Sequence, residues 1–233
     1  MHIHKALASV GVALACAAAA VSVGDVGEAA AADKRPNVVV LYLDDVNPKT
    51  PWLWSNSGRT PNLARFRQQG VEFRNAVGST PLCGPSRATL LTGQYSHTHG
   101  ITGNGLKGFD PSKTLATKLR SAGYHTILAG KYGHGIEKLA PTARSVKKYA
   151  KGWDDFDIIW KRPTKGQGQF YDYKLWTRDG VSWKGHAPKD HSTYVIGKRM
   201  ARHIREAPKS EPLFALASLN SGHTPNTPLK WHK

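Results

Sequence analysis

The chain has 233 residues, with 33 lysines and arginines against 16 aspartates and glutamates, and a formal net charge of +17. This length suits a single domain, and the charge indicates either anionic polymers as partners or a basic solvated surface. Two cysteines cannot build the framework of a disulfide-rich secreted protein. The basic residues are dispersed and no nucleic-acid-binding motif is present, so nucleic acid is not an expected partner.

Residues 1–32 have the pattern of a signal peptide. The basic start MHIHK precedes the apolar run ALASVGVALACAAAAVSV, and small residues up to Ala32 suit a cleavage site. Glycine and serine interrupt this run, so we expect export and no stable membrane insertion. Cleavage would remove Cys16 and leave residues 33–233 as a secreted, extracellular domain with Cys83 as its single cysteine.

The first elements after the leader alternate between strand and helix. Residues 36–43 form a near-continuous apolar run, which is typical of a strand buried on both faces. Residues 60–70 predict a helix with Thr60 as its cap and Phe66 on its apolar face. Residues 71–77 alternate between apolar and polar, which predicts a strand.

The same alternation continues along the rest of the chain. It predicts a helix at 110–123 capped by Ser112, a strand at 124–130, an ordered aromatic-rich insertion at 136–190, a helix at 193–207 and a strand at 212–220. Strands that alternate with helices predict an α/β fold with a mostly parallel sheet.

Polar side chains follow the ends of these strands. They are Asp44, Asp45, Cys83, Lys131, His134 and His223. Ligands bind at the carboxyl ends of the strands in open α/β sheets, so we expect these side chains to share one site. Taken singly, each has an ordinary alternative, such as a turn for the aspartate pair or a solvated surface for the lysine.

Cys83 begins the stretch CGPSRATLLTG. Pro85 suits the first turn of a helix and Gly93 its end, so Cys83 is expected beside a helix N-terminus. Free N–H groups there favour an anion, which predicts an acidified and oxidation-prone thiol. The alternative is a small buried apolar side chain, and the turn chemistry alone does not separate the two.

Residues 83–93 match the C-x-P-S-R-x-x-x-L-T-G signature of the sulfatases, and the chain resembles that family. The stretches PNVVVLYLDD, GYHTILAGKYGHG and SLNSGHTP resemble further family motifs and occur in the family's order. The resemblance implies an alkaline-phosphatase-like α/β fold, incomplete at its C-terminal end. GKYGHG and LLTGQYSHTHGITGN are most similar to the branch that contains N-acetylglucosamine-6-sulfatases and heparan endosulfatases.

The resemblance implies a sulfuric ester hydrolase that cleaves sulfate monoesters, with sulfated polysaccharides as candidate substrates. Cys83 would be oxidised to Cα-formylglycine by a formylglycine-generating enzyme, and the hydrated aldehyde would supply the nucleophile. This role explains a lone cysteine in an exported protein, because a disulfide partner would prevent the conversion. Residues 33–233 would form the N-terminal portion of the sulfatase catalytic domain.

The resemblance also implies roles for individual residues. The implied ligands of a divalent cation, Ca²⁺ or alternatively Mg²⁺, are Asp44, Asp45 and Cys83 after conversion. The implied catalytic residues are Cys83, Arg87, Lys131, His134 and His223. Arg87 would brace the formylglycine, Lys131 would contact the sulfate, and His223 would contact the sulfate or protonate the leaving alcohol. His134 departs from the family pattern, which places the histidine where this chain has Gly133.

Sulfatases are considerably longer than this chain, and their second metal-binding pair has no counterpart after His223. The sequence therefore resembles an N-terminal half. Two alternatives to a sulfatase stay open. One is a formylglycine-dependent phosphonate or phosphodiester hydrolase of the same superfamily, and the other is an inactive fragment that binds polyanions.

Overall fold

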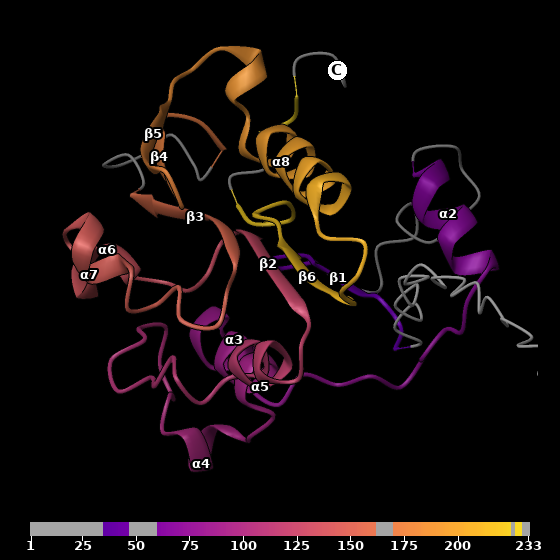
Figure 1. Cartoon of the computed structure of the whole chain (residues 1–233), viewed down its shortest axis with the longest axis horizontal. Helices are drawn as coiled ribbons and strands as arrows, with labels where there is room; N and C mark the ends of the chain where they lie inside the picture. Colours follow the sequence, from indigo (N-terminus) through magenta and orange to yellow (C-terminus); the bar gives the residue numbers. More distant parts are fainter. Residues whose placement is uncertain (1–34, 47–59, 162–169, 225–226, 230–233) are drawn as a thin grey trace, which may run out of the picture. The chain divides into compact units, whose positions relative to one another are not determined.

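The computed structural model describes residues 35–46, 60–161, 170–224 and 227–229 (Figure 1). The expected signal peptide, residues 1–32, lies outside the described residues. In the described part of the chain, no helix is both long enough and apolar enough to cross a membrane.

A six-stranded sheet organises the described residues, in the order β1-β6-β2-β3-β4-β5. The strands are β1 (Val38–Tyr42), β2 (His125–Gly130), β3 (Asp155–Lys161), β4 (Tyr173–Thr177), β5 (Gly180–Lys184) and β6 (Leu213–Ser218). The first four strands in this order are mutually parallel, and β4 and β5 extend the sheet in antiparallel fashion. The predicted α/β fold with a mostly parallel sheet is confirmed.

Helices connect the strands and cover both faces of the sheet. They are α2 (Pro61–Gln68), α3 (Cys83–Thr92), α4 (Ser96–His99), α5 (Leu115–Ser121), α6 (Ile136–Leu139), α7 (Ala143–Val146), the 3₁₀ helix η2 (Pro188–Asp190) and α8 (Ser192–Glu206). Helix α8 lies on one side of the sheet and α3 and α5 lie on the other (Figure 1). Leu128 of β2 packs into one core with α3, α5 and residues 136–153, whereas its neighbours Ile127 and Ala129 pack against α8. This alternation follows from the two-residue period of a strand, and it places two separate apolar layers on the sheet.

Strand β1 is present where the sequence predicts it, but its expected burial on both faces is wrong. Among the described strands β1 pairs with β6 alone. Val40 and Tyr42 pack against the core, whereas Val39 and Leu41 point to the other face and are 55 % and 52 % exposed. Helix α8 covers that face only over the neighbouring strands.

Other local predictions meet mixed outcomes. The helix at 60–70 is confirmed as α2, but Phe66 is exposed and the helix buries no side chain. Residues 71–77 form no strand. Helix α5 begins after Thr114, which exchanges hydrogen bonds with Thr117 in a capping box, so the predicted cap at Ser112 is wrong.

The later segments are closer to expectation. The strand at 124–130, the helix at 193–207 and the strand at 212–220 are confirmed as β2, α8 and β6. The described part of 136–190 is ordered as predicted, and it contains three strands that the sequence analysis did not separate. Residues 162–169 lie outside the described part.

Strands β2 and β6 approach closely where each ends. A Cβ on Gly130 would lie 1.8 Å from the Ser218 carbonyl oxygen, and Gly130 has φ +114. Only glycine fits such a position, because it lacks the side chain and tolerates positive φ. The close approach lets the Lys131 N–H donate to the Ser218 carbonyl at 2.9 Å, which fixes the direction in which the chain leaves β2.

Candidate active site

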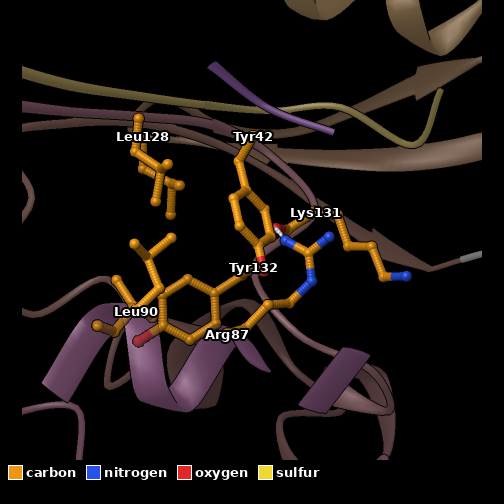
Figure 2. A pocket seen from close by; sticks show the side chains of 8 residues that line it. Tyr42, Arg87, Leu90, Leu128, Lys131 and Tyr132 are labelled. Carbon is orange, nitrogen blue, oxygen red and sulfur yellow. Dashed lines mark hydrogen bonds between the residues drawn. The ribbon is translucent and has the colours of Figure 1, made fainter. Parts of the chain in front are cut away.

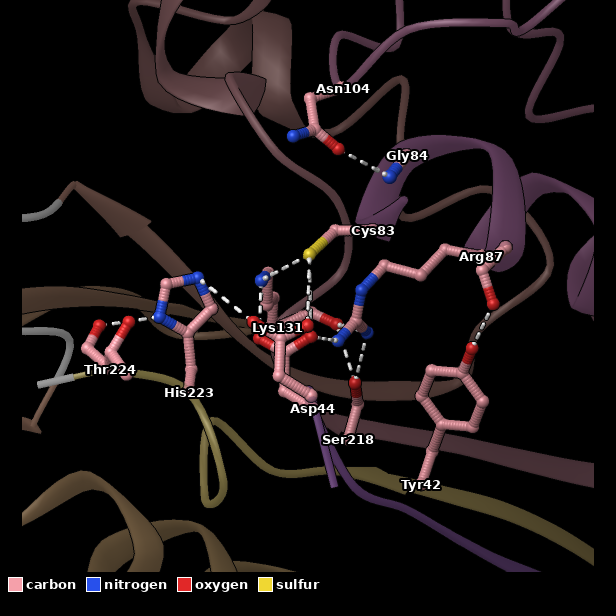
Figure 3. A network of polar contacts seen from close by, with 12 residues as sticks. Tyr42, Asp44, Cys83, Gly84, Arg87, Asn104, Lys131, Ser218, His223 and Thr224 are labelled. Carbon is pink, nitrogen blue, oxygen red and sulfur yellow. Dashed lines mark hydrogen bonds and ion pairs between the residues drawn. The ribbon is translucent and has the colours of Figure 1, made fainter. Parts of the chain in front are cut away.

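The carboxyl ends of three neighbouring strands meet the start of α3 (Figure 3). Asp44 follows β1, Lys131 follows β2, and Ser218 ends β6. Cys83 is the first residue of α3, and Gly93 ends that helix in the left-handed conformation. The structure therefore brings together residues that lie up to 131 positions apart in the sequence.

The Cys83 sulfur faces one cation and two carboxylates. Its Sγ accepts from Lys131 Nζ at 3.4 Å and lies 3.5 Å from Asp44 Oδ1 and 3.9 Å from Asp45 Oδ1. Burial raises the pKa of the thiol, the two carboxylates raise it further, and Lys131 offsets only part of this increase. The predicted acidification of the unmodified thiol is therefore wrong.

Arg87, one turn after Cys83 in α3, donates hydrogen bonds to groups at the ends of three strands. One of its nitrogens donates to the Lys131 carbonyl at 2.8 Å and to Ser218 Oγ at 2.5 Å, and the other donates to Asp44 Oδ1 at 3.1 Å. Its guanidinium lies 5.1 Å from the centre of the Tyr42 ring. With 3 % of its surface exposed, Arg87 is a buried cation that depends on these partners.

Asp44 is the anion that compensates this buried charge. Its carboxylate pairs with both Lys131 and Arg87, and all three side chains are buried. Burial raises the pKa of Asp44, but the two cations outweigh it and hold the pKa below its usual range. The site therefore contains a carboxylate that stays ionised and two cations fixed around it.

Asp45 and His223 lie on the exposed side of this group. Asp45 has φ 54, a left-handed conformation that aspartate tolerates better than most residues, and its carboxylate is half exposed. His223 Nε2 lies 3.6 Å from Asp45 Oδ2, and its Nδ1–H donates to the Thr224 carbonyl at 2.6 Å. This bond fixes the ring with Nε2 directed toward the carboxylate.

Asp44, Cys83 and His223 each offer one potential metal-ligand atom, and these atoms lie within 4.8 Å of one another. The two aspartates direct oxygens toward Cys83, which suits a hard divalent cation. Ca²⁺ takes about six to eight oxygens, so the described residues fit as part of its coordination shell. Sequence reasoning placed His223 only among the catalytic residues, and the structure adds it to this group.

His134 lies in the turn between β2 and α6 and is half-buried. Its catalytic role stays a prediction. A Cβ on Gly133 would lie 2.1 Å from Leu106 Cδ1, so a histidine at that position would require the Leu106 side chain to move.

The sequence analysis missed two polar residues of the site. Ser218 accepts from Arg87 and donates to the Lys131 carbonyl. A serine that ends an apolar strand gives only a weak signal of this role. Asn104 accepts from the Gly84 N–H at 3.3 Å, and a Cβ on Gly84 would clash with the backbone of Gly103 and Asn104. This loop therefore lies directly against the start of α3.

A small cavity lies behind the site, between α3 and the sheet (Figure 2). Its lining includes Tyr42, Arg87, Leu90, Lys131 and Tyr132. The volume of about 10 Å³ is at the lower limit for one water molecule. It is therefore a packing gap and too small for a substrate.

Comparison with known proteins identifies the family. The sequence profile named Sulfatase matches residues 36–233, nearly all of the chain after the expected leader. The chain belongs to the sulfatase family. Membership of this family also places the sheet in the alkaline-phosphatase-like class of folds, as the resemblance implies.

Several relatives of this sulfatase-family chain are named for one glycan substrate. N-acetylglucosamine-6-O-sulfatase of Bacteroides thetaiotaomicron is 29 % identical over 191 residues, which cover 82 % of this chain and 31 % of the relative. N-acetylglucosamine-6-sulfatase of Homo sapiens is 31 % identical over 218 residues, which cover 85 % and 36 %. The chain thus spans about a third of the length of these relatives.

A solved structure and an extracellular relative add to this picture. A protein solved in complex with its substrate D-glucosamine-2-N,6-O-disulfate superposes with a TM-score of 0.63 and 26 % identity, covering 82 % of this chain and 35 % of that one. A Drosophila melanogaster protein named extracellular sulfatase SULF-1 homolog is 36 % identical over 109 residues, which cover 44 % of this chain and 10 % of the relative.

Proposed function

We propose that this chain carries the formylglycine half of a sulfatase active site and serves in the hydrolysis of sulfate monoesters of glycans. The observation that carries the proposal is the position of Cys83. It opens α3 within the signature at residues 83–93, and its sulfur lies between Lys131 Nζ and the carboxylates of Asp44 and Asp45. An anion-binding cation and two potential metal ligands thus surround one reactive side chain.

Conversion of Cys83 to formylglycine by a formylglycine-generating enzyme is part of the proposal. The match of residues 83–93 to the signature of the sulfatases, together with the match of the Sulfatase profile to residues 36–233, supports it. Once hydrated, formylglycine supplies two hydroxyl groups on one carbon, one to attack sulfur and the other to release the sulfate. The remaining chemistry belongs to the residues around it.

Lys131 is positioned to bind a sulfate oxygen as that oxygen gains charge. Its Nζ already contacts the atom at the nucleophile position and is held there by Asp44. Arg87 acts as a positioning residue, because it fixes Asp44 and the Lys131 backbone and is buried away from the substrate side. His223 presents Nε2 on the open side, where it is suited to protonate the leaving alcohol. We assign no step to His134.

Asp44 and Asp45, together with the converted residue 83, would hold part of the shell of a divalent cation, Ca²⁺ or alternatively Mg²⁺. Their oxygen donors suit both of these hard cations. Such a cation neutralises negative charge on a bound sulfate ester. The names of the relatives support a sulfated glucosamine as the substrate, and the predicted leader together with the extracellular relative supports secretion.

Co-expression with a formylglycine-generating enzyme tests the proposal. Mass spectrometry of the peptide across Cys83 should show loss of one sulfur and two hydrogens and gain of one oxygen. The converted protein is then assayed on matched aryl sulfate, phosphonate and phosphodiester esters, with Cys83→Ala as the control. Turnover of the sulfate in preference to the other two supports the proposal. Conversion without any turnover, with salt-dependent binding of polyanions, would support the inactive-fragment alternative.

A further inference from the structure

The crossover between β2 and β3 carries an unusual concentration of positive charge. Five of its side chains are basic and exposed, namely Lys138, Arg144, Lys147, Lys148 and Lys151. Residues 136–153 include a single acid, Glu137. Within the described part of the chain, no ion pair is formed by any of these five cations. Because all five side chains are exposed, their charge faces solvent.

A second basic loop lies beside the first. Lys107 and Lys113 are exposed, and Lys113 makes only a loose pair with Asp110 at 3.8 Å. Hydrogen bonds from Ser112 lower the pKa of Asp110, and the charges of Lys113 and Lys151 contribute in the same direction. Lys151 is therefore close to this loop. We call the two stretches, residues 107–113 and 138–151, the basic strip.

Buried aromatic rings connect the basic strip to the active site. Tyr132, directly after Lys131, packs edge-on against Phe109 of one stretch and Tyr149 of the other, with centroid distances of 6.2 Å and 6.3 Å. Ile136 and Val146 are fully buried beneath the longer stretch. The cations therefore project from a packed base that is continuous with the turn holding Lys131.

The course of the chain sets the direction of the strip. Its longer stretch leaves the carboxyl end of β2, where Lys131 contacts Cys83, and returns to the amino end of β3. The two strands are parallel, so the stretch has to run from the site edge of the sheet to the opposite edge. Its cations are thus spread along a path that begins at the active site.

We propose that the basic strip binds the sulfate groups of an extended sulfated polysaccharide while one sulfate ester of the same chain occupies the site at Cys83. This inference rests on the proposed function for its substrate class. Lysine acts as a point charge on a flexible stem, which suits sulfates at variable spacing. A single-stranded nucleic acid would be held in part by base stacking on exposed aromatic rings, but Phe109, Tyr132 and Tyr149 are buried.

Binding of heparin-derived oligosaccharides tests the strip without requiring turnover. The test variant is K147Q/K148Q/K151Q. The matched control is K198Q/R205Q/K209Q, which removes three exposed cations on or just after α8, on the opposite face of the sheet. Affinities of the full chain for a disaccharide and an octasaccharide are measured by titration calorimetry at several salt concentrations.

We expect the wild type to prefer the octasaccharide, and the test variant to bind it about tenfold or more weakly. The slope of log K against log salt should fall by about one unit for each sulfate group that the variant no longer binds. The control should retain the wild-type octasaccharide affinity within about threefold, since its charges lie off the path. An equal loss of affinity in both variants would show that net charge alone attracts the polymer and would overturn the proposal.

Two further arms separate the alternatives. Single-stranded DNA of matched charge should bind more weakly than the octasaccharide, and equal binding with equal sensitivity to the test variant would overturn the choice of partner. Failure of the converted protein to hydrolyse any small sulfate ester contradicts the proposed function and leaves the binding result standing. Hydrolysis of small esters with no effect of the test variant on octasaccharide affinity contradicts the strip alone.

Discussion

At the scale of single residues, Arg87 shows how the site depends on hydrogen-bond geometry as well as on charge. Its planar guanidinium reaches Asp44, the Lys131 carbonyl and Ser218 at once. A lysine has the same charge but cannot donate in these directions from one planar group. Without two of these three hydrogen bonds, buried polar groups of the site would each lose one partner.

We therefore expect Arg87→Lys to lower the free energy of unfolding by about 2–4 kcal/mol. Urea denaturation followed by circular dichroism measures this change. Arg205→Lys, on the exposed end of α8, is the control and should change stability by less than about 0.5 kcal/mol. Equal stability of the wild type and Arg87→Lys would show that charge alone compensates Asp44.

Asp45 gives a direct test of cation binding. If its carboxylate is a ligand, Ca²⁺ should raise the melting temperature of the wild type in a concentration-dependent way, because a ligand of the folded state stabilises it. Asp45→Asn should lose most of the rise in melting temperature that Ca²⁺ causes. Asp110→Asn removes another exposed carboxylate and should show the same rise as the wild type. Differential scanning fluorimetry across a Ca²⁺ series, with a Mg²⁺ series beside it, measures the effect.

Single residues were predictable where chemistry and motif coincide. The aspartate pair and Lys131 follow β1 and β2, as the predicted strands require, whereas Cys83 follows no strand and reaches them from the start of α3. The pKa of Cys83 was not predictable, because it depends on carboxylates that only the fold brings near the thiol. The role of Ser218 was not predicted for the same reason, since its partners are distant in the sequence.

At the scale of elements, the contact between the ends of β2 and β6 sets the position of Lys131. The Gly130 backbone lies against the Ser218 carbonyl, and any side chain there would force the strands apart. Gly135 offers a matched comparison in the next turn. It also has positive φ, but an added Cβ would meet nothing within 4 Å.

Gly130→Ala should therefore lower stability by more than about 3 kcal/mol, since it adds a clash to backbone strain. Gly135→Ala should cost only about 1 kcal/mol from the strain. Chemical denaturation of both variants gives the comparison, and soluble yield gives a second measure if Gly130→Ala does not fold. Similar losses of stability in the two variants would contradict the close approach of the strands.

Asp154 links α5 to the start of β3 and gives a prediction about pH. Its carboxylate accepts from the Thr126 backbone and hydroxyl at 3.0 Å and 2.8 Å and from Arg120 at 2.7 Å. Burial raises the pKa of Asp154, but the Thr126 hydrogen bonds and Arg120 outweigh it and lower the pKa. The folded state therefore favours the ionised carboxylate.

A lowered pKa contributes stability that is fully present above the unfolded value, near 4, and is lost as the pH falls through the folded value. Asp154→Asn should lower the free energy of unfolding by about 1 kcal/mol at pH 7. It should also reduce the loss of stability that the wild type shows as the pH falls below about 4. Urea denaturation from pH 3 to 7 measures both effects. Asp179→Asn, in the exposed turn between β4 and β5, should leave the profile unchanged.

Elements were predictable where one periodic pattern ran through the whole segment. The apolar runs of β2 and β6 and the stripe of α8 are of this kind. Residues 71–77 alternate as a strand does but form none, because alternation creates no partner for the backbone groups. Strands β3 to β5 went unseparated because aromatic residues and lysines obscure their period.

At the scale of the whole molecule, the sheet ends at β1 in an exposed apolar edge. Val39 and Leu41 face solvent, and β1 pairs with β6 alone among the described strands. Such an edge offers unpaired backbone groups and apolar surface to another chain. The strand pattern could reveal a buried strand but not its position in the sheet, because strand order depends on contacts that are distant in the sequence.

We expect this chain to self-associate at micromolar concentration, and Val39→Lys with Leu41→Lys to reduce that association. Size-exclusion chromatography with light scattering measures it. Val71→Lys with Val77→Lys adds the same charge at exposed positions outside the sheet and is the control. A monomeric wild type, or equal improvement by the control, would contradict the role of the β1 edge.

The partners of Arg87 also impose an order on events during synthesis. Ser218 lies 131 positions after Arg87, so a ribosome that adds about 5–20 residues per second needs on the order of 10 s to supply it. Until β6 emerges, Arg87 lacks Ser218 as a partner, and the strand that lies between β1 and β2 in the sheet is missing. If Cys83 is converted as proposed, an enzyme that works alongside translation would have this time to reach the thiol before β6 completes the site.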